Sequence, residues 1–115
     1  MSDVQLVREP DLPFETVKGD GAHGLELARL YQHPDGAATF QLARVAPGGT
    51  SKRHAHPWDQ ANWIAQGEAE VDVEGRVYRL AAGDSIVIPG GLAHSFSNPG
   101  STPLVLAAVL GPGAP

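Results

Sequence analysis

The stretch GGTSKRHAHPWDQANWIAQG at residues 48–67 carries the strongest pattern in this chain, and GDSIVIPGGLAHSFSN at residues 83–98 complements it. Together they supply four candidate metal ligands: His54, His56, Gln60 and His94. Neutral imidazoles and an amide oxygen suit zinc, nickel, manganese or iron(II), and four donors leave coordination positions for water or substrate. The two stretches therefore predict a site for one divalent transition metal.

The spacing of the first three ligands indicates that they share one face of a strand. Alternate side chains of a strand point the same way, so His54 and His56, two residues apart, should aim together. Gln60 has the same parity and can rejoin that face, whereas Asp59 has the opposite parity and should point away. The fourth ligand, His94, must then arrive on a separate strand.

Short apolar runs separated by turn residues indicate an all-β chain. The sequence has 14 glycines and 10 prolines, which fall between the runs as in strands joined by tight turns. No stretch has a convincing helical period, so we expect a sandwich or a closed barrel. We expect the tail GPGAP, residues 111–115, to be flexible. The predicted strands cover residues 4–8, 25–31, 38–46, 61–73, 76–82, 85–89, 93–98 and 104–110.

Length and composition exclude several classes of function. A chain of 115 residues corresponds to one domain, and the absence of cysteine excludes disulfides, thiolate metal sites and a cysteine nucleophile. The formal net charge of −5 and the lack of a Lys/Arg cluster argue against a nucleic-acid partner. We find no signal-peptide pattern and no apolar run near the roughly 20 residues that span a bilayer. We therefore expect a cytoplasmic protein without a membrane partner.

The two stretches resemble the two sequence motifs of the cupin family. The first cupin motif reads G-x5-HxH-x3,4-E-x6-G, and this chain fits it with Gln in place of Glu: Gly48, His54, His56, Gln60 and Gly67. The second motif reads G-x5-PxG-xx-H-xxx-N, and every fixed position is matched: Gly83, Pro89, Gly91, His94 and Asn98. The 15 residues between the motifs are similar to the spacing in small single-domain bacterial cupins of the RmlC-like superfamily, cupin 2 type.

The resemblance implies a fold, a site and an assembly. It implies one cupin β-barrel over residues 1–115, with motifs at 48–67 and 83–98. Such a barrel is a double-stranded β-helix of the jelly-roll type with two antiparallel sheets, and it usually forms a homodimer. The resemblance also implies a metal at the barrel mouth, held by His54, His56, Gln60 and His94.

Gln60 departs from the family pattern and directs the functional prediction. A glutamate would bring a negative charge to the ion and glutamine brings none, so the site should favour an anionic ligand. We therefore predict a metalloenzyme that uses its ion (Mn, Ni, Zn or Fe) as a Lewis acid on a small anionic oxygenated substrate, in isomerase, lyase or cyclase chemistry. A metal-dependent dioxygenase and a non-catalytic sugar- or ligand-binding cupin stay open as alternatives.

Parity also predicts which other side chains face the cavity, although no general acid or base stands out. Within residues 38–46 the phase stays open: either Phe40, Leu42 and Arg44 or Gln41, Ala43 and Val45 line the barrel. An inward Arg44 would anchor a carboxylate. Trp58 is placed to rim the mouth, while Trp63 should pack between the sheets or at a dimer interface. The candidate pocket residues are Asn62, Ile64, Phe96, Phe40, Arg44 and Trp58.

Overall fold

The structure, a computed structural model, describes residues 4–19 and 21–114 and is all-β, as the sequence predicts. No helix among these residues has the length and hydropathy to cross a membrane. One short 3-10 helix, η1, covers Glu9–Asp11. The strands are β1 (Glu15–Thr16), β2 (His23–Gln32), β3 (Thr39–Thr50), β4 (Asp59–Gln66), β5 (Glu68–Val73), β6 (Arg76–Ala81), β7 (Ser85–Ile88), β8 (His94–Ser97) and β9 (Leu104–Gly111).

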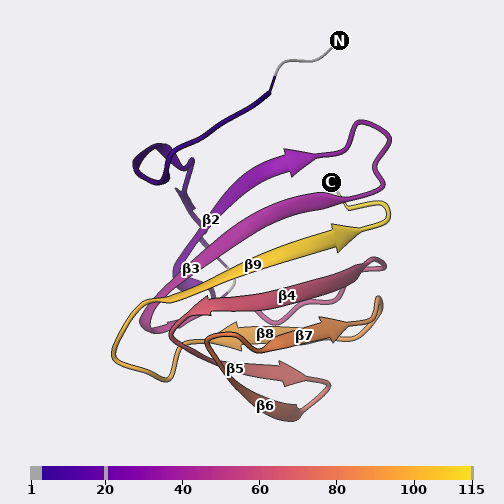
Figure 1. The fold of residues 1–115 in the computed structure, drawn as a ribbon. Coiled ribbons are helices and arrows are strands. Elements are labelled where there is room, and N and C mark those ends of the chain that lie inside the picture. The colour runs from indigo at the N-terminus through magenta and orange to yellow at the C-terminus, as the bar shows by residue number, and fades with distance from the viewer. Residues whose placement is uncertain (1–3, 20, 115) are drawn as a thin grey trace.

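The strands pair antiparallel in the order β6-β5-β8-β3-β9-β4-β7, and β2 adds β1 beside β3. β3 joins two faces of the barrel: its residues 39–45 pair with β9, while Thr50 at its end pairs with Ser97 of β8. Figure 1 shows β2, β3, β9 and β4 on one face and β8, β5 and β6 on the other. The sheet thus curls into a nearly closed barrel.

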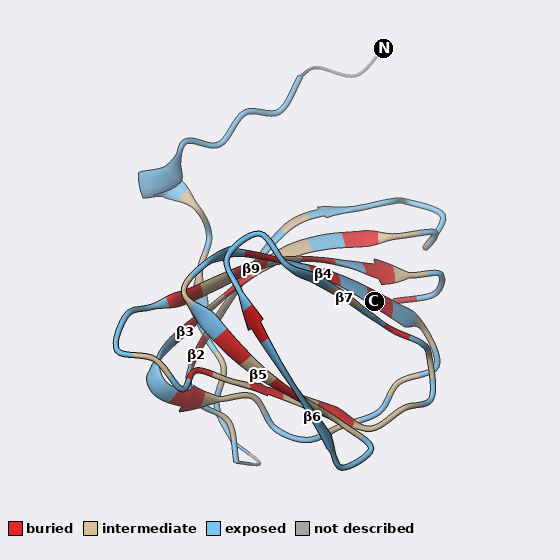
Figure 2. Cartoon of the chain, turned by 60° about the horizontal axis from the view of Figure 1, so that its bottom comes forward, coloured by how far each residue is buried: buried red, intermediate tan, exposed pale blue. Residues whose placement is uncertain are grey.

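Alternation along the strands builds the core between the two faces. β4 alternates between exposed and buried residues from Asp59 to Ile64, and β9 alternates in the same way over most of its length. Because successive side chains of a strand point to opposite faces, one row of each strand enters the core. Figure 2 shows the buried residues in red, between exposed and intermediate residues of the same strands. The core is formed by Leu25, Ala43, Val45, Ile64, Ala69, Val71, Leu80, Ile88, Phe96, Leu104, Leu106, Ala108, Leu110 and Ala114.

Most predicted strands are present, but two ranges differ. Residues 4–8 are exposed and form no strand, since an alternating sequence alone supplies no neighbouring strand to pair with. The predicted strand 61–73 is divided into β4 and β5 at Gly67, which has a φ of 82°. A side chain there would lie 2.5 Å from the Pro103 carbonyl oxygen, so this break requires glycine.

In the tail, Ala114 is buried while Pro112 and Gly113 are exposed, and Pro115 lies outside the described residues. Ala114 is 3% exposed. Its carbonyl accepts hydrogen bonds from the Gln32 amide at 3.5 Å and from the Thr39 hydroxyl at 3.4 Å. The Gly113 N–H donates to the Gly36 carbonyl at 2.7 Å. These bonds tie the end of the chain to the turn between β2 and β3, which the composition of the tail does not reveal.

Candidate metal centre

Three histidines from both motifs meet inside the barrel. His54 and His94 form an isolated antiparallel bridge, with backbone N–H to carbonyl distances of 3.1 and 2.9 Å. His56 lies two residues farther along, and its ring centroid is 5.3 Å from that of His54 and 4.9 Å from that of His94. One ligand nitrogen of each ring lies within 4.8 Å of the others. The predicted convergence of these histidines is therefore present, and the group can hold a metal ion.

Backbone carbonyls set the tautomer of each ring. Nδ1 lies 3.0 Å from the Lys52 carbonyl in His54, 2.9 Å from the Trp58 carbonyl in His56, and 2.9 Å from the Leu92 carbonyl in His94. A carbonyl oxygen only accepts, so Nδ1 must carry the proton in all three rings. In the neutral form of each ring Nε2 then carries the lone pair, which is the tautomer that metal ligation through Nε2 requires.

Asn62 sets the orientation of the Gln60 side chain. The Asn62 Nδ2 group donates to the carbonyls of Gln60 and Ile86, at 3.3 and 3.2 Å, which leaves Oδ1 as an acceptor. The Gln60 Nε2 group donates to that Oδ1 at 2.8 Å. The Gln60 amide oxygen is therefore turned to the opposite side, where it lies 3.1 Å from His56 Nε2.

Two features of this geometry fit a bound cation. In the neutral, metal-binding form of His56 with its proton on Nδ1, Nε2 has only a lone pair, so Nε2 and the Gln60 oxygen are then two acceptors in contact at 3.1 Å. His94 Nε2 is buried and has no hydrogen-bond partner in the described structure. Unsatisfied buried acceptors cost stability, and a cation among them would satisfy all three. The residues present therefore fit a divalent metal.

The electrostatics keep His94 in the form that ligation needs. Burial lowers the pKa of His94 below 6.5, and the neighbouring His54, His56 and Arg53 lower it further. The hydrogen bond to the Leu92 carbonyl opposes this shift. His94 is 1% exposed, so its imidazole is neutral near pH 7.

The segment before His94 is seated on the first motif by backbone contacts. The Gly91 N–H donates to the His56 carbonyl at 2.7 Å, and the Gly90 N–H donates to the Asp59 carboxylate at 2.8 Å. Asp59 therefore points away from the histidines, as its parity predicts. A side chain at position 90 would collide with the Pro57 carbonyl, so glycine is required for this close approach.

A cavity of about 410 Å³ extends from the histidines into the barrel. Its polar lining comprises Gln41, Ser51, Lys52, His54, His56, Gln60 and His94. Its apolar lining comprises Leu25, Leu27, Ala43, Val45, Ala55, Trp58, Phe96, Leu106, Ala108 and Leu110. A larger hollow of about 500 Å³ between β6 and β7 includes none of the four candidate ligands. All four candidate ligands therefore lie at the cavity of about 410 Å³.

The candidate pocket residues divide into three groups. Trp58 and Phe96 line the cavity, and the Trp58 indole is stacked on the His56 ring at 4.7 Å between centroids and 8° between planes. Sequence reasoning missed this stacking, which no spacing signals. Asn62 and Ile64 are buried on the inner face of β4 but lie beneath the cavity lining, where they hold Gln60 and fill the core.

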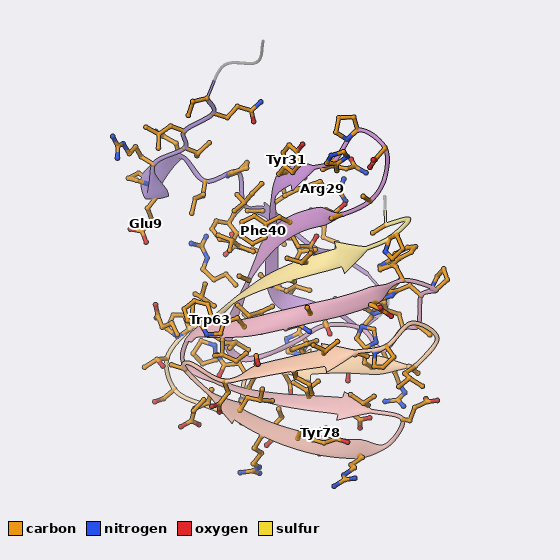
Figure 3. All side chains as sticks on the ribbon, turned by 45° about the vertical axis from the view of Figure 1, so that its right-hand side comes forward. Glu9, Arg29, Tyr31, Phe40, Trp63 and Tyr78 are labelled. Carbon is orange, nitrogen blue, oxygen red and sulfur yellow. The ribbon has the colours of Figure 1, made fainter. Side chains whose placement is uncertain are left out.

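Phe40 and Arg44 were among the candidate pocket residues, but they do not line the cavity, because both point out of the barrel. Gln41, Ala43 and Val45 take the inward phase of β3. Arg44 instead donates through Nε to the Glu26 carboxylate at 3.0 Å, and its guanidinium lies 3.9 Å from the centre of the Phe14 ring. Figure 3 labels Phe40 on the outer side of β3.

The prediction that Trp63 packs between the sheets is wrong. It is 51% exposed on the outer face of β4, because its parity is opposite to that of Gln60 (Figure 3). Sequence reasoning also left Lys52 and Ser51 out of the cavity, although both precede His54 closely. The irregular segment between β3 and β4 places both at the cavity, where Lys52 stays exposed, and strand parity does not apply there.

Comparisons with known proteins agree with this geometry. The chain is 33% identical over 106 residues to protein SchB of Streptomyces halstedii, covering 89% of this chain and 77% of that protein. It is 29% identical over 119 residues to mannose-1-phosphate guanylyltransferase ManC of Salmonella typhimurium, covering 95% of this chain. The chain spans only 25% of that relative's length.

A solved structure described as a "predicted oxalate decarboxylase" from Thermotoga maritima superposes with a TM-score of 0.83 and 27% identity. The match covers 92% of this chain and 97% of that one. The family model described as "Cupin domain" matches residues 41–110, which include both motifs and all three histidines of the cluster. The chain therefore belongs to the cupin domain family.

Proposed function

We propose that this cupin binds one divalent transition metal through His54, His56, Gln60 and His94 and is a metalloenzyme of the isomerase, lyase or cyclase type. Its substrate would be a small oxygenated anion. The observation that carries the proposal is a set of four neutral donors whose lone pairs converge at one end of a largely apolar cavity. Bound there, the ion would supply Lewis-acid polarisation of a substrate oxygen.

The residues of the chain have defined tasks in this proposal. Carbonyls at positions 52, 58 and 92 hold the Nδ1 protons, so the three imidazoles present Nε2 inward. Asn62 holds the amide of Gln60 so that its oxygen faces the histidines. The apolar wall excludes water, which strengthens the electrostatic attraction of an anion to the site. Because no donor is anionic, the site keeps the full positive charge of its ion.

The similar proteins support an anionic ligand without naming it. The structural neighbour from Thermotoga maritima is described as a "predicted oxalate decarboxylase", and oxalate is a small carboxylate. A second candidate function, non-catalytic ligand binding, is favoured by one observation: no carboxylate is among the described residues that line the cavity. Turnover of enolisable keto acids with added manganese, nickel, zinc or iron separates the two functions.

The Gln60→Glu variant tests the proposal directly, because it adds one negative charge to the donor set. We expect the variant to bind metal at least as tightly as the wild type and to bind carboxylates at least about tenfold more weakly. Isothermal calorimetry of acetate and oxalate with the zinc-loaded proteins measures this difference. Equal carboxylate affinity in the two proteins contradicts the proposal.

Gln66→Glu is the matched control for this experiment. It makes the same chemical change on the same strand, but Gln66 is exposed. A charge in solvent is screened, so carboxylate affinity should stay within about twofold of the wild type. A loss in Gln66→Glu equal to that in Gln60→Glu would assign the effect to net charge rather than to the donor set.

We also propose that two copies associate through the outer face of the sheet. Exposed side chains form a row there, in register across β2, β3, β9, β4 and β7: Tyr31, Phe40, Val109, Ala61 and Val87. Figure 3 labels Tyr31 and Phe40 of this row. Exposed apolar rows of this kind mark association surfaces. Light scattering should give a dimer mass for the wild type and a monomer mass for Val109→Glu; a monomeric wild type contradicts this proposal.

A further inference from the structure

The wall of the histidine cavity indicates the kind of molecule that fits behind the metal. We infer that the substrate carries an apolar body on its anionic oxygen group and is not a polyhydroxylated sugar. The inference rests on the proposed function, since it places the anionic group at the four donors. It concerns the rest of the ligand, which the donors do not determine.

The composition of the wall is the first observation. Ten of the seventeen lining residues are apolar, and they come from β2, β3, β8 and β9 as well as from the motif segment. Val45, Leu106 and Ala108 are at most 3% exposed, so their side chains belong to the packed interior of the barrel. A ligand that covers this wall gains free energy by removing apolar surface from water, in proportion to its own apolar area.

The second observation is that five of the seven polar lining residues, Ser51, Gln60 and the three histidines, already hold hydrogen bonds within the barrel. The Ser51 hydroxyl accepts a hydrogen bond from the Phe96 N–H at 2.8 Å. The Gln60 amide is held between Asn62 and His56, and each histidine Nδ1 donates to a carbonyl. A sugar hydroxyl that enters such a wall loses its bonds to water without gaining equivalent partners, which disfavours sugar binding.

The third observation is charge. Among the described residues that line the cavity, Lys52 is the one formally charged side chain, and it is positive. The volume of about 410 Å³ is at the small end of the range for ligand sites, so the body must be compact. The apolar wall, the hydrogen bonds of the polar lining and the positive charge of Lys52 together favour a compact anion with an aliphatic or aromatic body.

Two ring acids with the same head group test this inference on the zinc-loaded protein. The first probe is 1-hydroxycyclohexane-1-carboxylate. The second is quinate, which has the same ring and the same hydroxy-acid head but three further hydroxyls. We expect calorimetry to give at least about tenfold tighter binding of the first probe. Both titrations are repeated on metal-free protein.

A pair of serine variants locates the effect in the wall. Ala108 lines the cavity, whereas Ala107 is its outward neighbour on β9, paired with Trp63. Ala108→Ser places a hydroxyl in the wall and should reduce the preference for the apolar probe by about threefold. Ala107→Ser should leave that preference unchanged, and both variants should retain the zinc affinity of the wild type.

Each outcome decides between the inference and the proposed function. Quinate binding as tightly as the apolar probe, with metal required, overturns the inference and leaves the proposed function standing. An equal preference for the apolar probe with and without zinc supports an apolar pocket but overturns anion binding at the metal. If neither acid binds the zinc-loaded protein, both are wrong. Metal-dependent preference for the apolar probe, weakened only by Ala108→Ser, supports both.

Discussion

The inner and outer faces of β4 differ completely in role, although their residues alternate along one strand. Gln60 and Asn62 are buried on the inner face and share the amide network beside His56. Ala61 and Trp63, their immediate neighbours, face outward, and the indole is half exposed. A step of one residue therefore separates the candidate metal site from the molecular surface. Substitutions one residue apart should accordingly change different properties.

The largest effect is expected from a histidine of the inner cluster. His94→Ala removes a buried Nε2 donor, and metal affinity should fall by more than about 100-fold, because losing a group that only orients a ligand already costs about 10–100-fold. Competition with a chromophoric chelator measures the zinc dissociation constant. His33→Ala is the control, since His33 lies in an exposed turn beyond β2 and should leave the constant unchanged. Equal losses in the two variants would remove the distinction between the histidines.

The next effect tests the amide network. Asn62→Leu removes the acceptor that orients the Gln60 amide, so metal affinity should fall by about 10–100-fold while the three histidines remain. It also leaves the carbonyls of Gln60 and Ile86 without their donor, at a cost of about 1–3 kcal/mol in the free energy of unfolding. Ala61→Ser, one residue away on the outer face, should change neither property. Unchanged zinc affinity in Asn62→Leu would show that Gln60 needs no orientation.

Packing of β4 should show the same asymmetry in stability. Ile64 is fully buried, and Ile64→Val removes one buried carbon, which should lower the free energy of unfolding by about 0.5–1.5 kcal/mol. Trp63→Phe removes more atoms, but from the exposed face, and should change it by about 0.5 kcal/mol or less. Urea denaturation at equal protein concentration measures both. A larger loss in Trp63→Phe would mean that the outer face is covered.

Sequence parity predicted which side chains face the barrel interior where the strand is regular and a candidate ligand fixes the inward phase. On β4 the parity of Gln60 with His54 and His56 sets the phase, so the inward positions of Gln60 and Asn62 and the outward position of Asp59 were predictable from spacing. On β3 the sequence is apolar in both phases, with Phe40 and Leu42 outside and Ala43 and Val45 inside. Only pairing with β2 and β9 fixes which phase enters the barrel.

Contacts that no residue type marks were beyond prediction, whether they are local or join distant segments. The carbonyls that hold the histidine Nδ1 protons come from the backbone, and any residue supplies a carbonyl, so no residue type marks them. The strand predicted at residues 4–8 fails because pairing depends on a neighbour that the pattern does not contain. The contacts of the tail could not be predicted either, because Gln32 and Thr39, which hold Ala114, lie far along the chain.

The smallest expected effect is on the pH dependence of stability in metal-free protein, where a buried and an exposed titrating group should respond in different pH ranges. The pKa of His94 is lowered in the folded state, first by burial, while the unfolded chain has the ordinary value near 6.5. Below pH 6.5 the unfolded state therefore binds a proton that the folded state does not. The free energy of unfolding should fall as pH decreases from 6.5 toward the folded pKa, and His94 should contribute no pH dependence above 6.5.

The exposed surface should respond in a different range. The pKa of Asp72 is lowered, chiefly by its hydrogen bond from Arg53, so its contribution is present above pH 3.8 and is lost only in stronger acid. Because that pair is solvent-exposed, its effect on stability should be slight. Urea denaturation of metal-free wild type and His94→Gln at pH 7.5 and 5.5 isolates the buried group. The wild type should lose more stability than the variant over this interval, and equal losses would mean that His94 is protonated in the folded state, which its orphaned Nε2 and its neighbours disfavour.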